Sequence, residues 1–242
     1  MDPVTQGLLG ASLSSSFAKK KEIKYAAFFG ALGGLAPDLD IFIKSENDPL
    51  LFIEYHRHFT HSLIFVPIGG LIVALFLYLF FKNKFSLKCI YIYSTLGFFT
   101  HGLLDSLTSY GTTLFWPIYD YRVSWNIISI VDPIFTLILI IFIFFCLLRK
   151  SSFLIRVGLS LSFIYLFLGI IKKNQVNLFT SDIAKKRGHK IERILVKPTI
   201  GNNILWRSIY EFENHYYVNA IYMPFFDEPN YRKGVKLKVI NK

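Results

Sequence analysis

Residues that can bind a divalent metal ion occur in three short motifs of this chain. Asp carboxylates and His imidazoles together suit zinc or manganese, and such ions activate water or polarise the oxygens of a substrate. Hydrolysis is therefore the chemistry that these residue types favour. The three motifs are Pro-Asp-Leu-Asp at 37–40, His-Arg-His-Phe-Thr-His-Ser at 56–62 and His-Gly-Leu-Leu-Asp at 101–105.

Each motif also has an interpretation without metal. An Asp-x-Asp after proline is a common turn, and three His within six residues can form a solvated or pH-sensing loop. His101 and Asp105 share a helical face, so they can chelate an ion, Asp105 can orient His101, or the two can form a structural pair. Across the three motifs, the candidate ligands for one or two ions are Asp38, Asp40, His56, His61, His101 and Asp105.

Residues suited to an anionic substrate group follow the third motif. Thr108 and Gly111 lie in a hydroxyl-rich stretch, and Arg122 is the candidate for a bidentate clamp on phosphate or carboxylate. The alternative is an ordinary interfacial loop, because the aromatic residues at 115–121 are typical of a membrane boundary. Motifs of other hydrolytic mechanisms are absent from the sequence, which has no Gly-x-Ser-x-Gly, no Walker A loop and no His-Glu-x-x-His.

The composition indicates a membrane protein. The 242 residues are 53% hydrophobic and 18% charged, with a mean hydropathy of +0.43 and a net charge of +11. Soluble domains are less apolar and more charged, so the composition excludes an ordinary soluble domain and a disordered tail protein. Cys89 and Cys146 lie in apolar runs, where a thiol behaves as a small hydrophobe, and no disulfide framework is expected.

Four apolar segments predict membrane-spanning helices. Each has about 20 residues, enough to cross a hydrocarbon core of about 30 Å. Two shorter segments, 4–18 and 25–36, are rich in small residues and predict a closely packed pair of short helices that dips into the membrane. The four predicted spans are 62–81, 86–104, 127–148 and 153–171.

The predicted fold is an all-α multi-spanning membrane helical bundle over 1–171, followed by a small antiparallel β-rich domain over 172–242. β-branched and aromatic runs at 191–196, 204–210 and 216–222, separated by polar turns, predict the strands. If the four long helices alternate in direction, the basic loops face the cytoplasm, and the metal motifs and the C-terminal domain face outward. Topology then accounts for the basic charge, so no nucleic-acid partner is expected.

The order and spacing of these motifs resemble the YdjM family, whose members are bacterial and archaeal inner-membrane proteins described as metal-dependent hydrolases. The resemblance covers residues 1–135 and rests on the Asp-Pro-Val-Thr at 2–5, the three motifs, Thr108, Gly111 and the Asp-Pro at 132–133. It implies that the six candidate ligands bind a divalent metal, zinc or manganese. The His-x-x-x-Asp spacing is also distantly similar to zinc-dependent phospholipase C and related nucleases, which cleave phosphoesters.

One position departs from the family pattern. Many members have a Thr-His pair near their start, where this chain has Thr5 and Gln6. If the family His is a ligand, Gln6 can coordinate only weakly through its carbonyl oxygen. His58 stands where the family has Gly, and it is the candidate that would compensate.

The sequence therefore predicts a metal-dependent hydrolase of the inner membrane. Its expected substrate is a phosphoester or a membrane lipid, attacked by metal-activated water. The alternative is a non-enzymatic membrane protein in which the same residues form a structural metal site or part of an ion or proton pathway.

Overall fold

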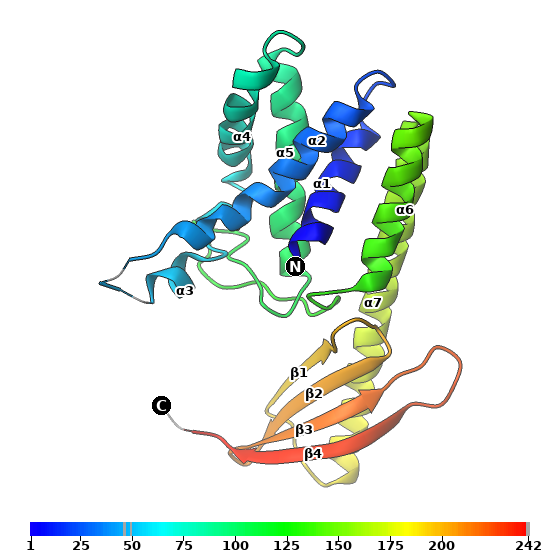
Figure 1. Cartoon of the computed structure of the whole chain (residues 1–242). Helices are drawn as coiled ribbons and strands as arrows, with labels where there is room; N and C mark the ends of the chain where they lie inside the picture. Colours follow the sequence, from blue (N-terminus) through cyan, green and yellow to red (C-terminus); the bar gives the residue numbers. More distant parts are fainter. Residues whose placement is uncertain (46, 49, 241–242) are drawn as a thin grey trace. The chain divides into compact units, whose positions relative to one another are not determined.

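The computed structural model describes residues 1–45, 47–48 and 50–240, which divide into two compact units (Figure 1). The first unit contains Met1–Trp125 and Ile134–Phe163, and the second contains Asn126–Pro133 and the chain from Ile164 onward. The predicted division into 1–171 and 172–242 stays a prediction.

The first unit is helical, and its helices begin at recognisable capping residues. The Asp2 carboxylate accepts the backbone N–H of Thr5 at 2.9 Å, and Pro3 occupies the first helical position of α1. Ser86 caps α5 by accepting the N–H of Cys89. The helices are α1 Pro3–Ser16, α2 Ile23–Leu35, η1 Ala36–Phe42, α3 Leu51–Tyr55, η2 Phe59–His61, α4 Val66–Phe81, α5 Leu87–Ser106, α6 Pro133–Arg149 and α7 Ser152–Lys186, which continues into the second unit.

Glycines allow α1, α2 and α5 to pack backbone against backbone. A Cβ on Gly97 of α5 would lie 2.0 Å from the carbonyl oxygen of Gly30 in α2, and a Cβ on Gly30 would lie 2.4 Å from that of Gly10 in α1. Such approaches are impossible for residues with a side chain, so these glycines set the helix spacing. The close packing predicted for the segments 4–18 and 25–36 is confirmed.

We expect Gly97→Ala to destabilise the first unit by about 1–3 kcal/mol, because the added methyl group must displace the α2 backbone. Gly7→Ala is the matched control: its Cβ would lie 3.5 Å from Leu35 Cγ, an ordinary contact, and alanine favours a helix. Thermal unfolding in detergent should show a lower midpoint for Gly97→Ala only. Equal midpoints for the two variants would contradict the close contact of α2 and α5.

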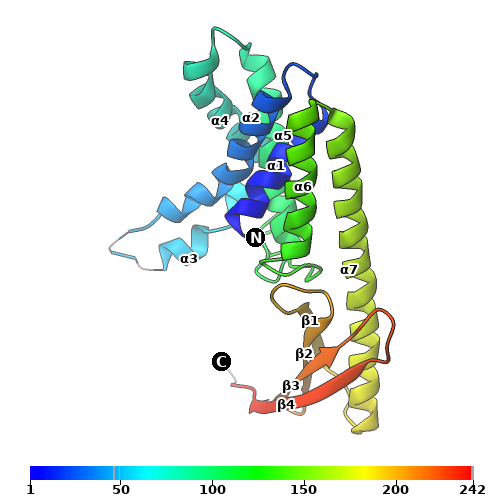
Figure 2. The same cartoon turned by 45° about the vertical axis from the view of Figure 1, so that its right-hand side comes forward.

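The second unit packs an antiparallel sheet against the later turns of α7 (Figure 2). Buried Trp206 and Ile221 of the sheet contact Val176 and Ile183 of the helix. The predicted strands are confirmed, and β4 is an addition: its residues are all exposed, and Val235 and Leu237 alternate with lysines over only a short stretch of a basic segment. The strands pair in the order β1 Arg193–Pro198, β2 Leu205–Phe212, β3 His215–Tyr222 and β4 Asn230–Lys238.

The prediction of a multi-spanning helical bundle is wrong. Among the described residues, only α7, with 35 residues, is by itself long and apolar enough to be a span candidate. The helices α4 and α6 have 16 and 17 residues, which reach only about 24–26 Å of a core about 30 Å thick. The helix α5 has 20 residues but carries the buried polar residues Ser94, His101 and Asp105.

The sequence overestimates these helices because apolar residues continue past the helix ends. The segment 62–81 begins with a turn, so Leu51–His61 and α4 meet at 91° and would add a second candidate only as one bent span. The segment 127–148 becomes helical only at Pro133. The outward orientation of the metal motifs depends on four alternating spans, and it loses that support.

Candidate metal centre

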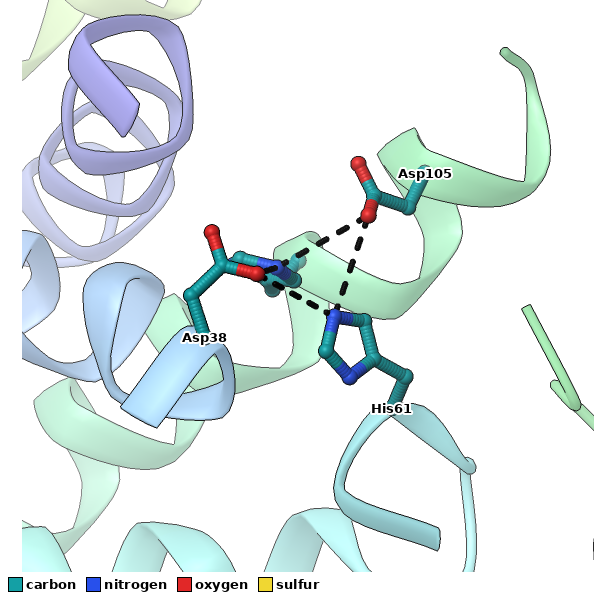
Figure 3. A group of neighbouring side chains, drawn as sticks. Asp38, His61 and Asp105 are labelled. Carbon is teal, nitrogen blue, oxygen red and sulfur yellow. Dashed lines mark ion pairs between the residues drawn. The ribbon is translucent and has the colours of Figure 1, made fainter. Parts of the chain in front are cut away.

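Four ionisable side chains from three segments of the first unit converge on one point. Asp38 comes from η1, His61 from η2, and His101 and Asp105 from α5. Figure 3 shows Asp38, His61 and Asp105 directed toward one another. One ligand atom from each of the four residues lies within 4.8 Å of the others. These four residues are called the Asp/His cluster below.

The distances inside the Asp/His cluster are close to those around a single ion. His61 Nε2 lies 3.5 Å from Asp38 Oδ1 and 3.7 Å from Asp105 Oδ2. His101 Nε2 lies 3.3 Å and 4.0 Å from the same two oxygens. Ligands at about 2.0–2.2 Å from a tetrahedral zinc ion are about 3.3–3.6 Å apart. The four His–Asp separations therefore lie within a few tenths of an ångström of tetrahedral coordination, and the His–His and Asp–Asp separations are within 4.8 Å.

The four atoms are buried without hydrogen-bond partners. Asp38 Oδ1, His61 Nε2, His101 Nε2 and Asp105 Oδ2 have no such partner among the described residues. The side chains of His61, His101 and Asp105 are fully buried, and that of Asp38 is 24% exposed. Burial of unsatisfied polar atoms is unfavourable, and a shared cation would satisfy all four. The Asp/His cluster could therefore hold a metal ion.

Backbone contacts determine which nitrogen of His101 faces the Asp/His cluster. Its Nδ1 lies 2.6 Å from the carbonyl oxygen of Gly34. A carbonyl only accepts hydrogen bonds, so Nδ1 carries the proton in the neutral ring and Nε2 presents its lone pair. The next residue, Gly102, lets η2 approach α5, because a Cβ there would lie 2.2 Å from the carbonyl oxygen of His61.

Asp40 lies behind two of the imidazoles and is fully buried. Its Oδ1 accepts from Nδ1 of His56 at 2.7 Å, and its Oδ2 lies 3.3 Å from Nδ1 of His61. The same Oδ2 accepts the N–H of Arg57 at 2.9 Å and the hydroxyl of Thr60 at 2.8 Å. The Thr60 hydroxyl lies 2.9 Å from the same Nδ1 of His61, so Thr60 and Asp40 together orient His61 with its Nε2 free to bind metal. Asp38, Asp40 and His56 also form a second group of ligand atoms within 4.8 Å of one another.

The two carboxylates of η1 are kept ionised by their neighbours. Burial raises the pKa of Asp38, but the imidazoles of His101 and His61 outweigh this effect, and the pKa falls well below its usual range. Burial also raises the pKa of Asp40, and its contacts with His56 and His61 bring the pKa below its usual range. Metal ligands must be deprotonated, so Asp38 is in the form that binds a cation, and Asp40 is in the form that accepts from the imidazoles.

We expect Asp40→Asn to weaken metal binding by about 10- to 100-fold without abolishing it. The reason is that Asp40 contacts Nδ1 of His61 and so orients a candidate ligand, but is not itself one of the four residues of the Asp/His cluster. Competition with a chromophoric chelator measures the affinity. Asp120→Asn is the control, since the Asp120 side chain is 74% exposed and pairs with His58. Wild-type affinity in Asp40→Asn would show that the carboxylate does not orient the ligand.

Of the other predicted residues, Thr108 contacts the Asp/His cluster, and Gly111 and His58 contact residues outside it. Thr108 is buried and donates its hydroxyl to the carbonyl oxygen of Asp105 at 2.8 Å. Gly111 has a φ of +70°, and a Cβ there would lie 2.7 Å from the Val123 carbonyl oxygen. His58 lies 3.3 Å from Asp120 and belongs to neither group of candidate ligands among the described residues, and its role as a replacement for the family His stays a prediction.

Arg122 lies at the surface and contacts backbone. It is exposed, and its Nη2 donates to the carbonyl oxygens of Ile53 and His56 at 3.1 Å and 3.0 Å. These bonds hold the end of α3 next to the His56 loop. The role of Arg122 as a clamp on an anionic substrate group stays a prediction, because these two contacts engage only its Nη2.

Arg57 contacts the Asp/His cluster, and sequence reasoning misses it. Its Nε lies 3.2 Å from Asp105 Oδ2. The signal was present, because Arg57 stands between two His of the densest motif. Gln6 donates Nε2 to the other oxygen of Asp105 at 2.9 Å, and the amino group of Met1 contacts that oxygen as well. Gln6 therefore lies beside the cluster as a partner of Asp105.

The helices of the first unit also present apolar side chains outward. Ile68, Leu75 and Phe80 of α4 are 52%, 48% and 70% exposed, and apolar surface of this kind is typical of contact with a membrane. Together with the buried Asp/His cluster, this defines a membrane-associated helical protein with a candidate metal centre. A family model described as YdjM inner membrane protein matches residues 1–176. The chain belongs to the YdjM family of inner-membrane proteins.

A curated relative extends the comparison. The chain is 26% identical over 213 residues to a protein of Bacillus subtilis (strain 168) described as uncharacterized protein YfhP. The match covers 83% of this chain and 62% of the relative, so this chain spans less than two thirds of that protein's length. No solved structure matches. The YdjM resemblance is confirmed, and these comparisons lend no support to a similarity with zinc-dependent phospholipase C.

Proposed function

We propose that this chain is a membrane-bound metal-dependent hydrolase in which Asp38, His61, His101 and Asp105 bind a divalent ion. The observation that carries the proposal is the convergence of four buried ligand atoms that lack hydrogen-bond partners among the described residues. Two imidazoles and two carboxylates near tetrahedral separations favour zinc, with manganese as the second choice. Of the six predicted ligands, His56 and Asp40 support the site from behind.

A divalent ion bound there would lower the pKa of a coordinated water to near neutrality and supply hydroxide for hydrolysis. The residues of the chain orient the site and control access. Asp40 and the Gly34 carbonyl hold the two imidazoles, and Gln6 and Arg57 hold Asp105. Asp38 is the partly exposed side chain of the Asp/His cluster, so substrate would enter beside it.

A lipid substrate is supported by two mostly apolar cavities along η1, neither of which is lined by Asp38 itself. A cavity of about 270 Å³ is bounded by Asp40 and Thr60 and otherwise by mostly apolar side chains, such as Phe65 and Phe98. It shares several lining residues, including Leu39, with an apolar pocket of about 400 Å³ between α2 and α4. An acyl chain is the apolar group that an inner-membrane protein meets in greatest supply, and such pockets favour it.

A structural metal site is the second candidate. Three of the four side chains are fully buried, and closed sites with four protein ligands are typical of structural zinc. The two candidates differ in whether a water molecule coordinates the ion.

Elemental analysis of detergent-purified protein tests the proposal. We expect about one zinc or manganese ion per chain, together with hydrolysis of a chromogenic phosphodiester or of phospholipid in micelles. Chelation should stop the hydrolysis, and added metal should restore it. A bound metal without hydrolysis of either substrate would favour the structural site. Protein that neither contains nor takes up metal would overturn both candidates.

A further inference from the structure

Arg57 is held rigidly at the edge of the Asp/His cluster. Its backbone has a φ of +64°, a conformation that non-glycine residues adopt rarely. The backbone N–H bonds to Asp40 at 2.9 Å, and the carbonyl oxygen accepts the N–H of Thr113 at 3.2 Å. The guanidinium lies 5.0 Å from the ring centroid of Tyr110. The loop, the backbone and the side chain are therefore all fixed.

One nitrogen of the Arg57 guanidinium lacks a hydrogen-bond acceptor among the described residues. Its Nε lies 3.2 Å from Asp105 Oδ2, an oxygen that also belongs to the Asp/His cluster. Its Nη1 is buried and has no hydrogen-bond partner among the described residues, although only 9% of the side chain is exposed. A buried cationic donor without an acceptor is costly, so a ligand that supplies an oxygen there would be bound favourably.

We propose that Arg57 Nη1 binds a phosphate oxygen of the substrate, next to the metal site. This inference rests on the proposed function and makes its substrate class definite: the group attacked is a phosphoester. A guanidinium matches phosphate because its planar array of N–H donors can engage two oxygens. The closeness of Arg57 to Asp105 puts the phosphorus within reach of the water that the metal site would activate.

The local charge permits an anion at this place. Three carboxylates, those of Asp38, Asp40 and Asp105, surround the site and would repel phosphate by themselves. A divalent ion, the Arg57 guanidinium and the Met1 amino group that contacts Asp105 together carry four positive charges, one more than the three carboxylates. Phosphate would then approach a site of net positive charge with one directed donor, which is the arrangement that favours specific binding of an anion.

A purely structural role for Arg57 accounts for less of what is observed. An arginine that only neutralised Asp105 would need no strained backbone and no buried unpartnered nitrogen. Arg122, the residue predicted from sequence for phosphate, donates its Nη2 to two carbonyl oxygens at the surface. Arg57 is the guanidinium that lies on the cluster itself.

Titration of metal-loaded protein with inorganic phosphate, followed by calorimetry, tests the inference without an activity assay. We expect Arg57→Gln to keep its metal and to bind phosphate about 10- to 100-fold more weakly than the wild type, the loss typical of a charge-assisted hydrogen bond. The phosphate affinity of Arg57→Lys should lie between those of the wild type and Arg57→Gln, since lysine keeps the charge and loses the planar geometry of the guanidinium. The control is Arg149→Gln, the same change at an exposed position in the last turn of α6.

Two further titrations, with lipid micelles, identify the source of the phosphate. Micelles containing phosphatidate should show the same dependence on Arg57, and micelles containing diacylglycerol should show none. Dependence with phosphatidate assigns a lipid phosphate, and dependence with inorganic phosphate alone assigns a soluble phosphoester; both support the inference.

Equal phosphate affinity in wild type and in whichever Arg57 variant is folded and metal-loaded would overturn the inference and leave the hydrolase proposal standing. Failure of the wild type to bind metal would overturn the hydrolase proposal, and the inference with it. Elemental analysis of each sample distinguishes the two failures.

Discussion

His101→Ala should remove the bound metal and reduce metal-dependent hydrolysis to the background rate. His101 offers one of the four candidate ligand atoms, and its ring is aligned by the Gly34 carbonyl oxygen. Alanine leaves three candidate ligands and a small polar hole, and without the ion the pKa of water rises back to its bulk value, so little hydroxide is present at neutral pH. Elemental analysis and a hydrolysis assay on the same preparation measure both effects.

His58→Ala is the matched control for this change. It also replaces a His with alanine, but His58 lies 3.3 Å from Asp120 and outside the Asp/His cluster. Its metal content and activity should equal those of the wild type. Asp105→Ala should lose metal too, but it also leaves the buried Arg57 without its partner, and breaking a buried pair costs about 3–5 kcal/mol. His101→Ala is therefore the cleaner test, and retained metal in that variant would refute the ligand assignment.

Metal removal should destabilise the protein strongly. A ligand that binds only the folded state adds about 4 kcal/mol when its free concentration is 1,000 times the dissociation constant. The effect applies here because the four ligand atoms come from η1, η2 and α5, which come together only in the folded chain. Thermal unfolding with excess chelator, compared with excess zinc, should therefore show a clear fall in the midpoint.

The His101→Ala variant provides the internal control for the chelation experiment. Its midpoint should respond little to chelator, because it binds no metal to lose. If chelator lowers the midpoints of the wild type and of His101→Ala equally, the stabilising ion binds somewhere other than the Asp/His cluster.

The candidate site could be predicted from sequence further than the fold could. The three motifs carry the four clustered residues, and the i, i+4 spacing of His101 and Asp105 is a property of any helix. The sequence does not distinguish the candidate ligands from the residues that orient them. Asp38 and Asp40 have the same chemistry and differ in which nitrogen of His61 they face, Nε2 for Asp38 and Nδ1 for Asp40. The position of Arg57 depends on a left-handed backbone in its loop, which a motif does not reveal.

For the helical part of the fold, the sequence predicts the general character but not the ends of the helices. Apolar composition identifies membrane character and the long helix α7, and small residues identify the close packing of α1 and α2. Composition does not mark helix ends, so the turn before α4 and the coil before Pro133 read as parts of spans. In α5 the polar residues needed by the site lower its hydrophobicity, and a 20-residue length alone does not make it a span.

Gly102 has a consequence for surveys of genomes. Many helices carry a His and an Asp four residues apart, because that spacing only requires a shared face. Here the residue after the His must leave room for the carbonyl oxygen of His61, which a Cβ would meet at 2.2 Å. A search that requires His-Gly-x-x-Asp would discard helices that merely pair the two side chains. It would retain those able to admit a second chain segment, with a third ligand, directly against them.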